Sequence, residues 1–325
     1  EAVCEEMGAV LQRSAFSPNI KDRLDFSCAV FDLCGALSAQ AAHIPVHLGS
    51  MAFAMASIVD QCSWAEGDMV VLNDPYLGGT HLPDVTVIAP VFVAGELIAF
   101  IANRAHHANI GATSPGSMPV STRLEQEGIV IPPTHLLRKH QWQQSVLDWL
   151  GDDIDRGDFV AQVSANAIGV SRLLELIMAM GGARYQQALL ELNDYGERVA
   201  LSELAKIPQG EYEFADCMDD DGAGTRDIPV CVAVTVKGSD IEIDFEGTSP
   251  QVAGNINCLL SVAAAGAWYV FRCRLPDYAP ACSGLFRPLS LKATIGSLLN
   301  ARYPSAVAAG NVETSSRVVD VVLGA

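Results

Sequence analysis

Residues 69–107 read MVVLNDPYLGGTHLPDVTVIAPVFVAGELIAFIANRAHH, and this stretch carries the strongest local signal in the sequence. Apolar runs at 69–73, 85–93 and 97–103 predict three strands, because each is short and is bounded by turn residues. The turn 94–96 is short enough to join the last two runs into an antiparallel hairpin. Pairing about that turn places Asp84 opposite about Ala105, at the same end of the sheet as His81.

The hairpin brings histidines and a carboxylate to one end of the sheet. His81 and Asp84 stand three apart in a Gly-Gly-Thr loop, and the returning strand carries His106 and His107 back to the same end. Successive strand residues point to opposite faces, so one of these two histidines is expected to join the site. Two imidazoles and one carboxylate with open positions suit Mn²⁺, Fe²⁺ or Zn²⁺. The alternative is that these side chains are polar caps at strand ends, and spacing alone leaves both interpretations open.

Other candidate residues are weaker. His43 and His47 stand four apart, but a proline between them argues against a continuous helix, so helix capping or hydrogen bonding in the core is the favoured role. Asp25 and Asp32 flank the stretch FSCAV and are either site residues or solvated strand ends. Glu127, in LEQEGIVIPP, is a candidate general base or metal ligand.

The helices and strands expected on both sides of residues 69–107 predict the α+β class, in the form of a mixed α/β fold. A histidine-bearing mixed α/β part at 1–206 is expected to precede a smaller α+β part at 207–325 that is rich in antiparallel strands. We expect an ordered loop at 111–140, because it contains four prolines and little periodicity. The expected helices are 3–13, 47–63, 158–180, 183–206 and 259–273, and the expected further strands are 26–32, 35–40, 211–218, 230–237 and 240–247.

Composition excludes several classes of partner. The 325 residues carry 20 basic and 38 acidic side chains, a formal net charge of −18, which disfavours nucleic acid and anionic membrane surfaces. Nine cysteines without a CxxC pair favour a reducing compartment, and we expect a cytoplasmic protein. The chain has neither GxGxxG nor GxxxxGK[ST], so no nucleotide site of its own is predicted. All seven histidines precede residue 141, which places the expected chemistry in the first half.

Seven stretches of the sequence are RSAFSPNIKDRLDFSCAVFD, AQAAHIPVHLGSM, GDMVVLNDPYLGGTHLPDVTVIAPVF, NRAHHANIG, EGIVIPP, DFEGTSPQVAGNINC and GSLLNARYPSAVAAGNVETSSRVVDVVLGA. Taken together, they resemble the hydantoinase B/oxoprolinase family, which includes N-methylhydantoinase B, the C-terminal part of 5-oxoprolinase and the metal-binding subunit of acetone carboxylase. Cys282, Ser283 and Ala301 depart from the residues expected of the family, which bears on substrate details. Family members are normally longer, and the chain begins without methionine and ends in an apolar run, so we expect it to be part of a longer polypeptide.

The resemblance implies a metal-dependent subunit of an ATP-dependent hydrolase acting on cyclic amides such as hydantoins, 5-oxoproline or lactams. A hydantoinase A-type partner would bind ATP and phosphorylate the substrate, so a hetero-oligomer is expected. The family's metal ligands fall on His81, Asp84 and His106, with Asp25 as a further ligand. By hypothesis, His107 and Glu127 transfer protons.

Two alternatives remain open at this stage. The first is the metal-binding subunit of an acetone- or acetophenone-type carboxylase, in which the same site would serve an enolate or bicarbonate. The second is a scaffold without activity that docks the ATPase subunit.

Overall fold

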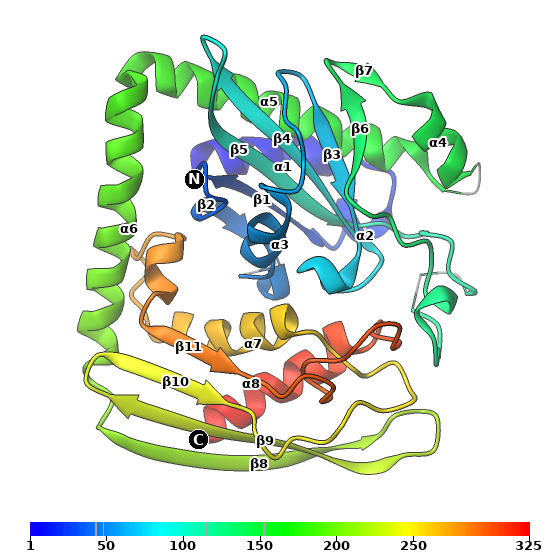
Figure 1. The fold of residues 1–325 in the computed structure, drawn as a ribbon, viewed down its shortest axis with the longest axis vertical. Coiled ribbons are helices and arrows are strands. Elements are labelled where there is room, and N and C mark those ends of the chain that lie inside the picture. Colours follow the sequence, from blue (N-terminus) through cyan, green and yellow to red (C-terminus); the bar gives the residue numbers. More distant parts are fainter. Residues whose placement is uncertain (43, 48, 115, 117, 152–153) are drawn as a thin grey trace.

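The computed structural model describes residues 1–42, 44–47, 49–114, 116, 118–151 and 154–325. Two sheets lie one above the other, and a long helix, α6 (Gly182–Leu204), runs along one side from the first to the second (Figure 1). The first sheet has seven strands and the second has four. This arrangement of open, largely antiparallel sheets with helices is the mixed α+β class that the sequence predicts.

The seven-stranded sheet has the order β2-β1-β5-β4-β3-β6-β7, and its neighbouring strands are antiparallel. The hairpin β4–β5 lies at its centre, as the sequence predicts, and β1 pairs with β5 along the other edge of that hairpin. The strands are β1 (Phe26–Phe31), β2 (Leu37–Ala42), β3 (Met69–Leu72), β4 (Asp84–Val93), β5 (Glu96–His106), β6 (Thr134–Arg138) and β7 (Gln141–Trp142).

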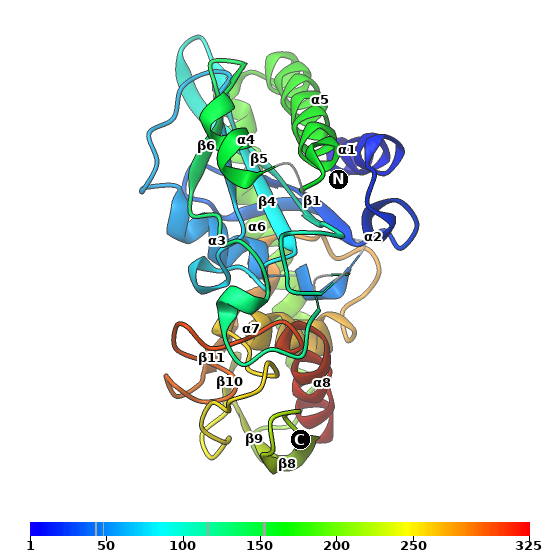
Figure 2. The same ribbon diagram turned by 90° about the vertical axis from the view of Figure 1, so that its right-hand side faces the viewer.

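Helices cover both faces of this sheet, because successive side chains of β1 pack against helices on opposite faces. Cys28 and Val30 pack into a core with α1 (Ala2–Ser14) and α5 (Arg156–Met180), whereas Ala29 and Phe31 face α3 (Ser50–Ile58). Both faces of the strand are therefore buried, which explains why its sequence is apolar throughout. Figure 2 shows α1 and α5 side by side on one face and α3 on the other. The remaining helices of this part are α2 (Pro18–Lys21) and α4 (Gln144–Leu150).

The four-stranded sheet has the order β11-β10-β9-β8, with β10 and β11 parallel and the other pairs antiparallel. Residues of β9 alternate between buried and more exposed, and the buried residues pack under α7 and α8 (Figure 1). The elements are β8 (Gly210–Asp220), β9 (Arg226–Lys237), β10 (Asp240–Asp244), α7 (Leu260–Arg272), β11 (Leu289–Lys292) and α8 (Ser315–Gly324).

Two expectations for local structure need correction. Residues 111–140 contain a 3₁₀ turn at Leu124–Gln126 and the strand β6, which pairs with β3, so this stretch is only partly loop. The expected helix 47–63 is the shorter α3, which begins only after Gly49, because the backbone of Gly49 has φ +85° and lies outside the helical region. A 3₁₀ turn at Pro45–His47 precedes it. The other short turns are Pro75–Leu77, Ser283–Phe286 and the π turn Gly310–Thr314.

Helix α5 is long and apolar enough to cross a bilayer by length and composition. Its inner side, however, carries Gln162 and Asn166, and both side chains are buried and hydrogen-bonded to β4 and β5. Core helices pass the same composition test. We therefore interpret α5 as a helix packed on the first sheet. The division of the chain near residue 207 stays a prediction.

Candidate metal centre

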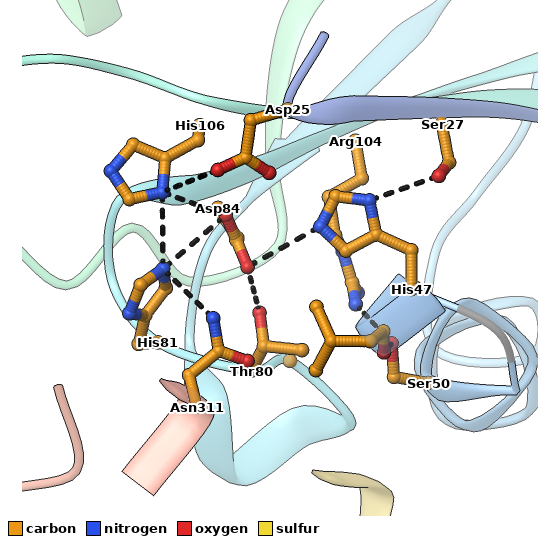
Figure 3. A network of polar contacts seen from close by, with 12 residues as sticks. Asp25, Ser27, His47, Ser50, Thr80, His81, Asp84, Arg104, His106 and Asn311 are labelled. Carbon is orange, nitrogen blue, oxygen red and sulfur yellow. Dashed lines mark hydrogen bonds and ion pairs between the residues drawn. The ribbon is translucent and has the colours of Figure 1, made fainter. Parts of the chain in front are cut away.

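Three nitrogen and oxygen atoms form a nearly equilateral triangle at one end of the first sheet (Figure 3). His81 Nε2 lies 3.4 Å from Asp84 Oδ1 and 3.3 Å from His106 Nδ1, and His106 Nδ1 lies 3.4 Å from Asp84 Oδ1. A tetrahedral ion with ligand bonds of about 2.1 Å holds its ligand atoms about 3.4 Å apart. The three atoms therefore fit one face of such a coordination sphere, which leaves the positions beyond that face to further ligands. We call these residues the triad.

The strand register places two members of the triad. Asp84 begins β4 and His106 ends β5, and the two are direct partners in the antiparallel ladder. The sequence predicts Asp84 opposite about Ala105, so the actual register differs by one residue at this end. The cause is a β-bulge between Val91 and Phe92, which shifts the pairing beyond it.

The Gly-Gly pair before Thr80 brings His81 toward the other two ligands. A Cβ at Gly78 would lie 2.4 Å from the backbone nitrogen of Ala54 in α3, and the backbone of Gly78 has φ +85°. A Cβ at Gly79 would lie 2.7 Å from the carbonyl oxygen of Asp74. The loop therefore turns tightly against α3, and side chains at these two positions would push it away.

The second part of the chain supplies the partners of His81. The Nδ1 of His81 donates to the carbonyl oxygen of Ala308 at 3.1 Å, and Asn311 Nδ2 lies 3.2 Å from His81 Nε2. Because a carbonyl oxygen only accepts, the proton of the neutral ring lies on Nδ1 and the lone pair of Nε2 points into the triad. A metal-binding histidine commonly shows this arrangement, in which the other ring nitrogen is held by a backbone carbonyl.

The carboxylate of Asp84 is buried and ionised. Burial opposes its charge, but the charge of His81 and the neighbouring rings of His106 and His47 outweigh burial and hold the pKa of Asp84 well below its usual range. Burial likewise opposes the charge of His81, but the charge of Asp84 outweighs burial and raises the pKa of His81. Thr80 donates its hydroxyl to Asp84 Oδ2, while Oδ1 has no hydrogen-bond partner among the described residues. A buried, charged oxygen of this kind suits a cation.

Asp25 and His47 lie beside the triad and form a second group of candidate ligands with Asp84. Asp25 Oδ2 is 3.5 Å from His106 Nδ1, and its side chain, at 24% exposure, is the most exposed of this cluster. His47 is fully buried, with Nδ1 3.0 Å from the Ser27 hydroxyl and Nε2 3.4 Å from Asp84 Oδ2. His47 thus hydrogen-bonds in the core, and it also faces Asp84. His43 lies outside the described residues.

His107 lies on the other side of the sheet from the triad. Its Nε2 lies 2.9 Å from the side-chain oxygen of Gln162, and its ring packs edge-on against Phe159. Both of these residues belong to α5. Burial lowers the pKa of His107, which favours the neutral ring. The proton is then on Nε2, and Nδ1 has no hydrogen-bond partner among the described residues.

Glu127 is fully buried and holds the segment that bears Ala308. One of its oxygens accepts hydrogen bonds from the backbone N–H groups of Val307 and Ala308, at 2.9 and 3.0 Å, and from the Ser121 hydroxyl. Burial raises the pKa of Glu127, although these hydrogen bonds oppose the shift. Its contacts reach the triad through Ala308 and His81. Asp32, the other weak candidate, accepts hydrogen bonds from the backbone of the β1–β2 turn.

Sequence reasoning missed two residues near the triad, Asn311 and Arg104, and the contact of His47 with Asp84. The guanidinium of Arg104 is 1% exposed and donates to Thr86, Ser50 and the carbonyl of Gly78. Burial lowers its pKa to about 10, so it remains a cation at neutral pH. The negative charge of Asp84 opposes this shift and favours the cation. An arginine inside an otherwise apolar strand was the available signal for this group.

The family model for hydantoinase B/oxoprolinase matches residues 1–325. The chain belongs to this family. It is 36% identical over 334 residues to an uncharacterised protein of Methanocaldococcus jannaschii, covering 99% of this chain and 59% of that protein. It is also 36% identical over 359 residues to 5-oxoprolinase 1 of Arabidopsis thaliana, covering 99% of this chain and 28% of that protein. This hydantoinase B-type chain therefore spans well under two thirds of either relative.

Solved structures share the fold. The crystal structure of the ATP-dependent caprolactamase from Pseudomonas jessenii superposes with a TM-score of 0.92 at 27% identity, over 99% of this chain and 57% of that one. A nucleotide-free acetone carboxylase structure superposes with a TM-score of 0.87 at 17% identity, over 95% of this chain and 44% of that one. The second likeness shows the fold alone.

Proposed function

We propose that this chain is the metal-dependent part of an ATP-dependent enzyme that hydrolyses cyclic amides. The observation that carries the proposal is the triangle of His81 Nε2, Asp84 Oδ1 and His106 Nδ1, whose edges of 3.3–3.4 Å fit one cation. The names of the relatives support the substrate class, because 5-oxoprolinase and caprolactamase are named for cyclic amides.

One divalent transition-metal ion, Zn²⁺, Mn²⁺ or Fe²⁺, fits the imidazole and carboxylate donors of the triad. When bound, such an ion supplies Lewis-acid chemistry that polarises an oxygen or makes water a better nucleophile. Charge favours one ion over two. A single divalent ion balances Asp25 and Asp84, whereas a second ion held by Asp25, His47 and Asp84 would add two charges beside the buried Arg104 cation.

The side chains around the ion would then have distinct tasks. The triad would hold the ion, and Asp25 would be a further ligand at the exposed edge, where it already faces His106. His47 would orient Asp84 from the second carboxylate oxygen. His107, whose Nδ1 has no hydrogen-bond partner among the described residues, and Glu127, with its raised pKa, stay the proposed proton-transfer groups. Because His107 lies across the sheet from the triad and Glu127 contacts it through Ala308, each would exchange its proton through intervening groups and not with the substrate directly.

The partner in this proposal is a hydantoinase A-type ATPase subunit that binds ATP and phosphorylates the amide oxygen. An unstrained lactam is a poor electrophile. Phosphorylation of the amide oxygen makes the carbonyl carbon more electrophilic, so that water can attack it. This chain would then direct water to that carbon, the ring C–N bond would break as the nitrogen takes a proton, and a second water would release phosphate from the acyl phosphate that remains. The assembly would be a cytoplasmic hetero-oligomer.

A carboxylase subunit is the second candidate, favoured by the likeness in fold to acetone carboxylase. The two candidates differ in their product. The full-length protein, its ATPase partner and ATP would be supplied with labelled bicarbonate and acetone in one reaction, and with 5-oxoproline or caprolactam in another. A labelled acid in the first reaction and no ring opening in the second would overturn the hydrolase proposal.

The metal assignment is tested separately by element analysis of the purified full-length protein and of His81→Ala. We expect about one transition-metal ion per chain in the native protein, and loss of both metal and hydrolysis in the variant. Full metal occupancy in His81→Ala would overturn the assignment of the triad.

A further inference from the structure

Asn311 is a buried amide whose hydrogen-bonding groups are only partly used by the described residues. It is 8% exposed, its Oδ1 has no hydrogen-bond partner among them, and its Nδ2 lies 3.2 Å from His81 Nε2 (Figure 3). An unpaired buried oxygen costs free energy, so its presence next to the triad calls for an explanation.

The group that Asn311 contacts is the lone pair that an ion would take. His81 Nδ1 donates to the carbonyl of Ala308, so the lone pair of the neutral ring lies on Nε2. An ion held there would take the lone pair of Nε2 from the Asn311 amide. Neither end of the amide would then have a partner among the described residues. An ion about 2.1 Å from Nε2 lies no more than about 5.3 Å from Asn311 Nδ2, within reach of a molecule bound at the open position.

The backbone holds Asn311 in a fixed place. It is the second residue of the π turn Gly310–Thr314, a type of turn that is frequent at functional sites. Gly310 donates its N–H to the carbonyl of Asn255, and the Thr314 hydroxyl donates to the carbonyl of Ile256. A Cβ at Gly310 would lie 1.9 Å from the carbonyl oxygen of Asn257, so this turn packs directly on the segment 255–257. The amide is therefore pre-organised before any ligand arrives.

We propose that Asn311 recognises the amide group of the substrate at the open position beside the triad, an inference that rests on the function proposed above. A primary amide offers a donor and an acceptor side by side, which complements the acceptor and donor of a cyclic amide. The ring nitrogen is an acceptor in the phosphorylated form and a donor once it is protonated, and Asn311 can pair with it in both states. A ketone or an enolate offers acceptors only. Asn311 thus favours amides over the substrates of a carboxylase.

The test uses full-length protein loaded with Co²⁺, whose visible absorption reports changes in coordination. Acetohydroxamate, which carries an amide N–H and carbonyl, and acetate, which has no N–H, are titrated into the native protein and into Asn311→Leu. We expect Asn311→Leu to retain Co²⁺, to bind acetohydroxamate about 10-fold more weakly, and to bind acetate within 2-fold of the native protein. Val312→Ala, at the next and exposed residue, is the matched control and should behave as the native protein does.

Asn311→Asp keeps the shape of the side chain and provides a second measurement if the leucine variant does not fold. Its added carboxylate should bind the ion about 10-fold more tightly and should remove the preference for acetohydroxamate over acetate. Loss of Co²⁺ from Asn311→Leu, with retention in Asn311→Asp, would show that Asn311 only positions His81 and would overturn the inference. Unchanged binding of both probes in folded variants would overturn it as well. Native protein that binds no ion, or opens no cyclic amide with its partner, would instead overturn the proposed function.

Discussion

Asp84, the first residue of β4, and His106, the last residue of β5, lie directly opposite each other, and His106 Nδ1 is 3.4 Å from Asp84 Oδ1. The next residue, His107, lies on the opposite side of the sheet against α5. Two adjacent histidines therefore have separate surroundings, one beside a carboxylate and one in a polar network under a helix. Their replacement should have different consequences.

We predict that His106→Ala lowers metal affinity by more than about 100-fold, because loss of a ligand exceeds the 10- to 100-fold effect of changes around a ligand. His107→Ala should retain the metal and instead lower the free energy of unfolding by about 1–3 kcal/mol, because it removes the partner of the buried side-chain oxygen of Gln162. Competition with a chelator measures the first effect and urea unfolding the second. Equal metal loss in both variants would contradict the assignment.

The central hairpin was predictable because its turn, its apolar runs and its polar ends are all local features. The register near the turn follows the expected pairing at Phe92–Leu97 and Val93–Glu96. Beyond the bulge it is one residue off, and a bulge leaves no clear mark in the sequence. Asn311 could not be placed by local reasoning, because it lies 230 residues from His81 in the chain. His47 was assigned to the core by its proline neighbour, and its second contact depends on tertiary packing.

Glu127→Gln should lower metal affinity by about 10-fold, because it removes a charged acceptor that holds the segment carrying Ala308, the partner of His81. Glu125→Gln is the matched control, since Glu125 lies in the 3₁₀ turn just before Glu127, is exposed, and pairs at the surface with Arg123. Isothermal titration with Zn²⁺ measures both variants.

The same variant separates two roles of Glu127. If Glu127 acts purely in proton transfer, Glu127→Gln keeps native metal affinity and loses turnover with the partner. A metal affinity that falls together with turnover indicates that it acts by positioning His81.

Gly310→Ala should destabilise the protein by about 1–3 kcal/mol, because the new Cβ would meet the carbonyl oxygen of Asn257 at 1.9 Å and force the π turn away from segment 255–257. Gly182→Ala is the opposite case. This glycine begins α6, has no atom within 4 Å of an added Cβ, and should gain about 0.4–1 kcal/mol from a less flexible unfolded chain. Urea unfolding of both variants tests the pair, and a stable Gly310→Ala would show that the turn is not tightly packed.

The buried thiol of Cys4 should make the free energy of unfolding fall as the pH rises through the alkaline range. Burial raises the pKa of its thiol from 9.0 to about 11, so the folded state keeps a proton that the unfolded state loses between these values. The stabilising contribution is complete below about pH 9 and declines as the pH rises toward 11. Native protein should therefore lose up to about 2 kcal/mol more than Cys4→Ala across this window. Urea unfolding at several pH values measures the difference, with Cys34→Ala, at an exposed thiol, as the control. Parallel pH profiles for native protein and Cys4→Ala would contradict the shift.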